Sequence, residues 1–250
     1  MWVSNDTEER VGFSTGALEK GDYRKAVSWL QNESVDSVEL SALRYDELEP
    51  LVQDLDSLPL GGFRHISFHA PSSFEQEQEK HVVDLLGNVH KRGWNIVVHP
   101  DVIYRPRLWS HFGEQLLIEN MDQRKPVGRN IRELERWFEE LPKARLCLDV
   151  AHARQMDTTL SLLINIFRRF IDRIAEVHIS ELDSNYRHRP MSRTAVNDFK
   201  RLAPGLKRSI PIIIESGLGG KRATLRKEEL QLAREATRTN SDPSTPSPRY

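Results

Sequence analysis

Short runs of aliphatic and β-branched residues alternate with longer amphipathic segments along almost the whole of this 250-residue chain. Such alternation is typical of β-α units, in which helices cover buried parallel strands. Eight runs are expected to form strands: 11–16, 37–42, 65–70, 95–100, 115–120, 145–151, 175–180 and 210–216. Eight strands with intervening helices fit a closed barrel better than an open doubly wound sheet, which usually has fewer strands. The sequence therefore predicts a single (β/α)₈ barrel of the α/β class.

The segments between these runs have helical periodicity. They cover 23–31, 46–55, 75–91, 131–141, 160–171, 194–202 and 227–236, and only the connection around 107–112 is short enough for one or two turns. From 237 to 250 the chain is rich in Ser, Thr, Asn and Pro and has almost no aliphatic residues, so it cannot bury enough surface to order itself. We therefore expect one barrel over 1–236 and a disordered tail over 237–250.

Composition excludes several classes of protein. The formal net charge of -1 argues against a surface that binds polyanions in general. The polar N-terminus and the lack of a long apolar run predict a cytoplasmic protein that does not enter a membrane. Cys147 is the only cysteine and lies in an apolar stretch, so a buried structural thiol is expected rather than a nucleophile. No phosphate-binding glycine motif indicates a nucleotide cofactor.

Residues that can bind a metal follow one predicted strand after another. They are His69 in FHAP, His99 in VHP, Glu119 in IEN, Asp149 and His152 in LDVAH, His178 in VHIS, and Glu215 in IES. In a parallel barrel the carboxyl ends of all strands meet at one face. Most of these residues directly follow an apolar residue that can pack on the helices, so strand alternation directs them inward. The sequence predicts that they share one pocket.

Any one of these side chains alone could be a polar group satisfied at a strand end. Together, Glu119, Asp149 and Glu215 would repel one another in a buried pocket, and a divalent cation removes that conflict. Mixed imidazole and carboxylate ligands suit Zn²⁺, Mn²⁺, Fe²⁺ or Co²⁺ better than Ca²⁺, without choosing among the four. We therefore expect a divalent metal as the cofactor.

These motifs, in this order, resemble the xylose isomerase-like TIM-barrel superfamily, which includes sugar isomerases, sugar epimerases and the endonuclease IV type of abasic-site nuclease. The resemblance extends to about Glu215. The sugar branch implies one metal held by Glu119, Asp149, His178 and Glu215. It also implies that Glu119 and Glu215 are catalytic and exchange protons with the two faces of the substrate. The metal then stabilises the charge of an enediolate. A metal-dependent isomerase or epimerase of sugars or sugar phosphates is the leading hypothesis.

The endonuclease IV branch implies a different use of the same residues. His69, His99 and Glu119 would hold one zinc ion, and Glu119 would bridge to a second held by Asp149, His178 and Glu215. A third zinc ion would need His152 and an Asp-x-His pair after the seventh strand, where this chain has Tyr186, Arg187 and His188. The missing aspartate favours the sugar branch, although Glu181 or Asp183 could replace it. His188 can equally be a substrate ligand or an exposed histidine.

Further side chains bear on the substrate. Glu39, at the end of the second strand, and Arg187 are candidates for substrate binding. In the sugar branch, His152 would contact a substrate hydroxyl or orient a ligand. One or two arginines suffice to bind a sugar phosphate, whereas a nucleic-acid duplex needs a continuous basic track. The basic residues expected near the mouth are Arg44, Arg105, Arg107, Arg124, Lys125, Arg129, Arg187, Arg189 and Arg193. Each of them can also be an ordinary solvated side chain.

The expected partner is therefore a small sugar or sugar phosphate, with nucleic acid only under the nuclease alternative. A non-catalytic barrel that binds metal is a third alternative, since metal binding does not by itself require turnover. Many barrels of this kind associate, so a homo-oligomer is also left open. The loops have no recognisable pattern that would identify the sugar, the reacting carbon or the metal.

Overall fold

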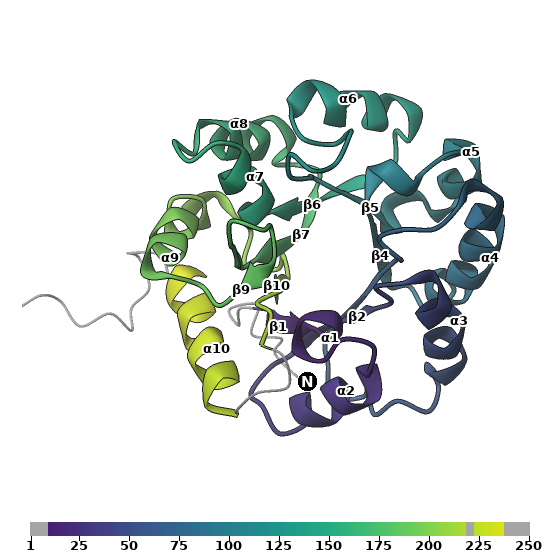
Figure 1. Ribbon diagram of the computed structural model, residues 1–250, viewed down its shortest axis with the longest axis horizontal. Coiled ribbons are helices and arrows are strands. Elements are labelled where there is room, and N and C mark those ends of the chain that lie inside the picture. Colours follow the sequence, from purple (N-terminus) through teal and green to yellow (C-terminus); the bar gives the residue numbers. More distant parts are fainter. Residues whose placement is uncertain (1–9, 219–222, 238–250) are drawn as a thin grey trace, which may run out of the picture.

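The computed structural model describes residues 10–218 and 223–237. Its central feature is a closed barrel of parallel strands in the order β1-β10-β7-β6-β5-β4-β3-β2 (Figure 1). The barrel strands are β1 (Val11–Ser14), β2 (Ser37–Ser41), β3 (His65–His69), β4 (Asn95–Val98), β5 (Leu116–Glu119), β6 (Arg145–Asp149), β7 (Ile174–Ile179) and β10 (Ile212–Ile214). All eight predicted strands are confirmed, with ends that differ by one or two residues.

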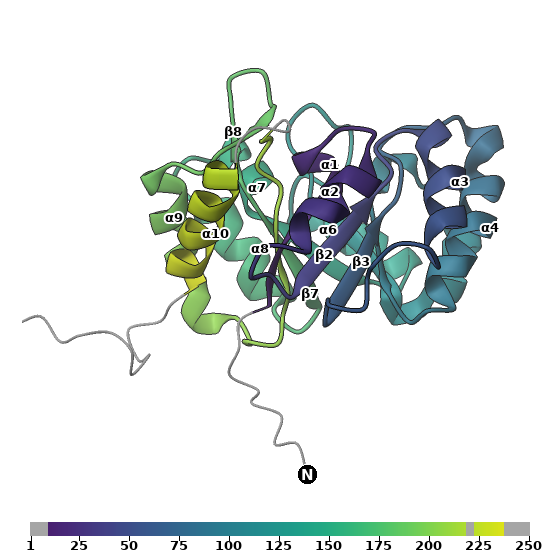
Figure 2. The same ribbon diagram turned by 90° about the horizontal axis from the view of Figure 1, so that it is seen from below.

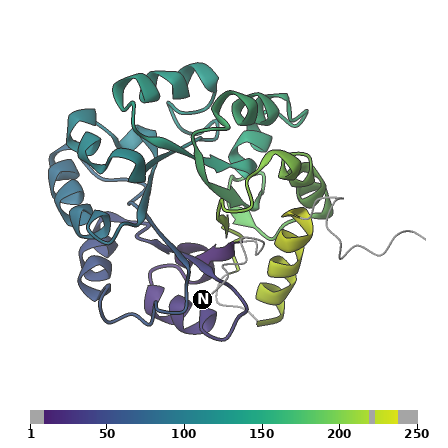
Figure 3. The same ribbon diagram turned by 180° about the vertical axis from the view of Figure 1, so that it is seen from behind.

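Helices surround the barrel on the outside, as Figures 1 and 3 show from its two ends. They are α1 (Thr15–Leu18), α2 (Tyr23–Leu30), α3 (Tyr45–Asp54), α4 (Glu79–His90), α5 (Pro106–Trp109), α6 (Ile131–Glu140), α7 (Val150–Met156), α8 (Ser161–Phe170), α9 (Arg193–Lys200) and α10 (Ala223–Thr237). Short 3₁₀ turns occur at Gln76–Gln78, Pro100–Val102, Ser110–Gln115 and Ala203–Gly205. The predicted alternation of strands and helices is thus confirmed.

Alternation along the strands separates two apolar layers. In β2, Val38 and Leu40 belong to the large core between strands and helices, while Ser37, Glu39 and Ser41 lie on the other face. A smaller buried cluster fills the barrel interior and consists of Val97, Leu117, Cys147 and Ala175. Burial raises the pKa of the Cys147 thiol well above its usual range, so this cysteine is a packed, protonated side chain rather than a thiolate.

Two elements differ from the predictions. Strand β6 ends at Asp149, two residues early, because the Asp149 side chain accepts a hydrogen bond from the His152 backbone at 2.6 Å and caps α7. An antiparallel hairpin of β8 (Glu181–Leu182) and β9 (His188–Arg189) was not predicted, and it projects from one end of the barrel (Figure 2). Both differences lie where the chain leaves the barrel at the carboxyl ends of strands.

The predicted tail begins at Thr237, which is the last residue of α10, and 238–250 lie outside the described residues. Within the described ranges, no helix has the length and apolar character needed to cross a bilayer.

Barrel closure depends on the absence of a side chain at Gly12 in β1. A Cβ atom there would overlap the backbone oxygen of Ser37 in the paired strand β2. The two strands could accommodate a methyl group only by moving apart.

We expect Gly12→Ala to lower the free energy of unfolding by about 1–3 kcal/mol or more, because overpacking forces backbone shifts. Gly87→Ala is the matched control, since nothing lies within 4 Å of a Cβ at that position in α4. The control should be neutral or stabilising by up to about 1 kcal/mol. Denaturant titration of both variants tests this, and equal stabilities would contradict the role of Gly12.

Candidate metal centre

The first group of potential ligands comes from three adjacent strands. His69 ends β3, His99 follows β4, and Glu119 ends β5. One carboxylate oxygen of Glu119, Oε2, lies 3.1 Å from Nε2 of both histidines. The Nδ1 atom of His69 lies 2.7 Å from the backbone oxygen of Ala70, which leaves Nε2 to face the site. The three side chains therefore converge on one point.

The second group shares Glu119 with the first. It comprises Glu119, Asp149, His178 and Glu215, whose ligand atoms all lie within 4.8 Å of one another. Nδ1 of His178 is 3.7 Å from Oε1 of Glu119 and 3.4 Å from Oε2 of Glu215. The predicted core of the site is thus assembled, and Glu119 belongs to both groups.

A third group contains Asp149, His152 and His188. The rings of His152 and His188 are 5.5 Å apart, and Oδ2 of Asp149 is 3.7 Å from Nδ1 of His152. That Nδ1 also lies 2.9 Å from the backbone oxygen of Asn120. His188 comes from β9, and its Nδ1 is 2.8 Å from the Ser180 hydroxyl. Asp149 therefore supplies a carboxylate to this group although Tyr186 replaces the expected aspartate.

The carboxyl groups are strongly perturbed by burial. Burial, together with the nearby carboxylates of Glu119 and Glu215, raises the pKa of Asp149 to about 7 against the opposing effect of His152. Burial acts in the same direction on Glu119, but the surrounding imidazoles outweigh it and hold the Glu119 pKa well below its usual range. The site thus gathers negative charge that needs a compensating positive charge.

The imidazoles respond in opposite ways. Burial lowers the pKa of His99. At His69 burial also lowers the pKa, but Glu39 and Glu119 outweigh it and raise the value to about 9. Nearby acidic groups likewise overcome burial at His178 and raise its pKa well above the usual range. Bound protons supply part of the positive charge that a metal ion would provide.

Two buried atoms show that the donor set fits a cation. Oδ2 of Asp149 and Nδ1 of His178 have no hydrogen-bond partner among the described residues, and both belong to the second group. A carboxylate oxygen and an imidazole nitrogen, both buried and unpartnered, are ligands that a divalent metal accepts. The three groups together offer the mixed nitrogen and oxygen set predicted from the sequence.

Two polar side chains of the site were not predicted as ligands or partners. Glu176 lies beneath His178 in β7, and its Oε1 is 3.2 Å from Nε2 of His178. A charged residue two positions before a site histidine, in an otherwise apolar strand, was the available signal. Asp122 is fully buried, and its Oδ2 is 3.9 Å from Nε2 of His152. It follows β5 in a loop, where no alternation pattern indicates direction.

The predicted substrate residues lie in different environments. Glu39 is fully buried in β2, and its Oε2 lies 3.1 Å from Nε2 of His178, so it lies deeper than the mouth. Arg187 is exposed in the turn between β8 and β9. Most of the predicted mouth cations are in ion pairs with acidic residues: Arg44, Arg105, Arg124, Lys125, Arg129 and Arg193.

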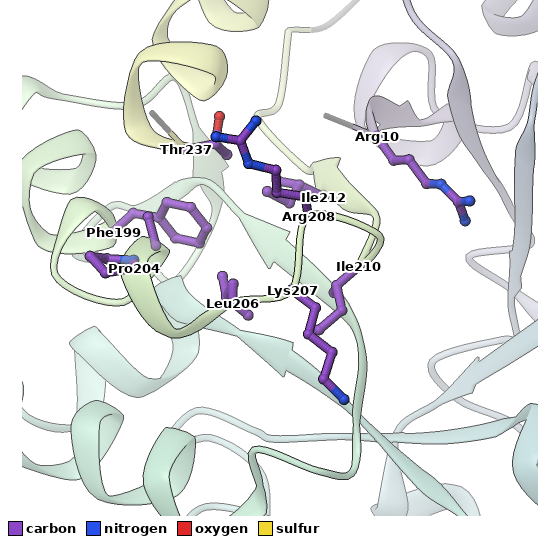
Figure 4. A pocket seen from close by; sticks show the side chains of 10 residues that line it. Arg10, Phe199, Pro204, Leu206, Lys207, Arg208, Ile210, Ile212 and Thr237 are labelled. Carbon is purple, nitrogen blue, oxygen red and sulfur yellow. The ribbon is translucent and has the colours of Figure 1, made fainter. Parts of the chain in front are cut away.

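A separate hollow of roughly 250 Å³ lies at the amino ends of the strands (Figure 4). Its cationic side chains, Arg10, Lys207 and Arg208, point apart from one another in that view. They do not converge on a common ligand position.

No family model and no curated protein matches the sequence. Solved structures do match. Endonuclease IV from Thermus thermophilus is 19% identical, with a TM-score of 0.58 and coverage of 91% of this chain and 98% of that chain. The 3-keto-D-glucoside 4-epimerase from E. coli is 11% identical, with a TM-score of 0.56 and coverage of 92% and 99%. The chain shares the TIM-barrel fold of these structures.

A third solved structure, a xylose isomerase domain containing protein from Salmonella typhimurium, is 14% identical with a TM-score of 0.55 and coverage of 94% and 96%. The similarity thus extends over nearly the full length of each matched chain. At these identities it establishes the fold, whereas the reaction has to be argued from the side chains of the site.

We expect Zn²⁺ or Mn²⁺ to raise the unfolding temperature of metal-stripped protein, because an ion bound only by the folded chain stabilises it by about 2.7 kcal/mol at 100 times its Kd. Asp149→Asn should abolish most of this shift, since asparagine still caps α7 but lacks the charge. Asp84→Asn, on the exposed face of α4, should keep the whole shift. An unfolding temperature that does not respond to either metal would contradict the site.

Proposed function

We propose that this protein hydrolyses phosphate esters with the help of two or more divalent metal ions. The observation that carries the proposal is the position of Glu119, whose two carboxylate oxygens face different groups of ligands. Oε2 faces His69 and His99, while Oε1 lies 3.4 Å from His152 and 3.7 Å from His178. A carboxylate placed in this way can hold two ions close together.

The first group of ligands supports two ions rather than one. His69 and His99 are not part of the set that a single-metal site would use, yet both are largely buried and directed at Glu119. Pairs of closely spaced metal ions are characteristic of enzymes that cleave phosphate esters. The similarity in fold to an endonuclease IV agrees with this chemistry.

Divalent ions held by the residues of the three groups would supply Lewis-acid charge, which stabilises a phosphoryl transition state and lowers the pKa of water. The chain itself fixes the ligands and controls access. Glu215 and His188 have 14% and 29% of their side-chain surface exposed, whereas the Glu119 side chain is 1% exposed. A substrate therefore reaches the site past Glu215 and His188, and His188 can donate a hydrogen bond to a phosphate oxygen.

The charges around the mouth favour a compact substrate. A nucleic-acid duplex binds through many phosphates and needs many free cations. Here most of the basic side chains expected around the mouth are neutralised by Asp or Glu, as in the pair of Arg124 with Asp122. We therefore propose a small phosphate ester as the substrate, and duplex DNA with an abasic site as the alternative within the same chemistry.

A sugar isomerase or epimerase is the second candidate. The complete group of Glu119, Asp149, His178 and Glu215 supports it, because this group is the single-metal set that the resemblance implies. Glu119 and Glu215 would then move protons on opposite sides of the substrate. Tyr186, in place of an aspartate, also agrees with this candidate. The isomerase hypothesis, however, leaves the burial and direction of His69 and His99 without a function.

The two candidates differ in their need for His69. We expect metal-loaded protein to hydrolyse bis-p-nitrophenyl phosphate, and His69→Gln to lower kcat/KM by about 100-fold or more, since several kcal/mol of transition-state stabilisation would be lost. His90→Gln is the matched control, because His90 lies on α4 beside Phe112, away from the three groups. Duplex DNA with an abasic site and a panel of sugars and sugar phosphates complete the assay.

Nicking of abasic DNA with slow turnover of the small ester would replace the proposed substrate but keep the proposed reaction, hydrolysis of a phosphate ester. Conversion of a sugar that persists in His69→Gln, without hydrolysis of any phosphate ester, would refute the proposal and support the isomerase. Metal binding without turnover of any substrate would support a non-catalytic barrel.

A further inference from the structure

We propose that Glu176, held by His65, is a positioning residue that orients the His178 ring for metal binding. The two residues lie inside the barrel, beneath the metal-binding groups. They are not part of the metal-binding set that the sequence predicted. The inference rests on the metal centre of the proposed function but not on the reaction that the centre catalyses.

Glu176 is fully buried and uses both carboxylate oxygens. Oε1 accepts a hydrogen bond from the Ser67 hydroxyl at 3.1 Å and lies 3.2 Å from Nε2 of His178. Oε2 lies 2.8 Å from Nε2 of His65. Ser67 and His65 belong to β3, which stands opposite β7 in the order of strands around the barrel. The network therefore crosses the full width of the interior.

The contact between Glu176 and His178 determines which ring nitrogen of His178 is free to bind a metal. A hydrogen bond from Nε2–H to Glu176 leaves Nδ1 facing Glu119 and Glu215, at 3.7 and 3.4 Å. Histidines that bind metals commonly donate their second ring N–H to a carboxylate, which fixes the tautomer and the ring orientation. Nδ1 of His178 has no hydrogen-bond partner among the described residues, as a nitrogen reserved for a metal should.

A second carboxylate competes for the same proton. Oε2 of Glu39 lies 3.1 Å from Nε2 of His178, but it does not form a hydrogen bond with it. Both oxygens of Glu39 are buried without a hydrogen-bond partner among the described residues, whereas Glu176 is anchored independently of His178 by Ser67 and His65. The anchored carboxylate therefore fixes the direction of the N–H bond.

The test compares Glu176→Leu, Glu176→Gln and Glu39→Leu in the full chain. Zinc affinity is measured by competition with a chelator, and the His178 ring N–H proton is followed by NMR with ¹⁵N-histidine. We expect Glu176→Leu to weaken zinc binding by about 10–100-fold and to lose the slowly exchanging proton signal. Glu176→Gln should restore much of the affinity, because its amide oxygen still accepts the hydrogen bond. Glu39→Leu should retain the signal.

Glu79→Gln controls for the loss of a buried charge, since Glu79 is buried outside the barrel and bonds to Arg105 and Trp109. It should leave zinc affinity unchanged. Wild-type zinc affinity in both Glu176 variants, or loss of the proton signal in Glu39→Leu instead, would overturn the inference. Absence of zinc binding by the wild-type chain would also overturn it. Zinc-loaded protein without phosphoesterase activity would refute only the proposed function, because the ranking of affinities would persist.

Discussion

The shared position of Glu119 between two groups of histidines and acids is the interaction on which the rest of the site depends. Its carboxylate is almost wholly buried, within 3.1 Å of His69 and His99 and within 3.7 Å of His178. A charge buried this deeply is stable only when it is paired. The barrel supplies the pairing by bringing strand ends from distant parts of the chain to one point, and a metal ion would complete it.

Much of this arrangement could be predicted from the sequence. Strand alternation and the convergence of carboxyl ends are general properties of parallel barrels, so they place Asp149, His178 and Glu215 together without knowledge of any contact. The strands could also be predicted, because the apolar pattern of a buried strand is a local property of consecutive residues. In the group that contains His152 and His188, the carboxylate belongs to Asp149, whereas the resemblance implied an aspartate two positions before His188.

One unpredicted feature depends on a contact between distant residues. The bond between Ser67 and Glu176 joins strands on opposite sides of the barrel, and no local pattern reports which side chains meet across the interior. The early end of β6 has a local cause, because Asp149 caps the next helix as well as facing the site. Ion pairs around the mouth such as that of Arg105 with Glu79 join residues far apart in the sequence. The sequence identifies these basic residues but not the acidic residues with which they pair.

Elemental analysis of protein purified without added metal tests most directly whether the site holds more than one metal ion. Two or more ions per chain are expected, with one fewer in His99→Gln, because His99 serves only the group that a single-metal site leaves unused. A single ion per chain that remains in His99→Gln would contradict the account.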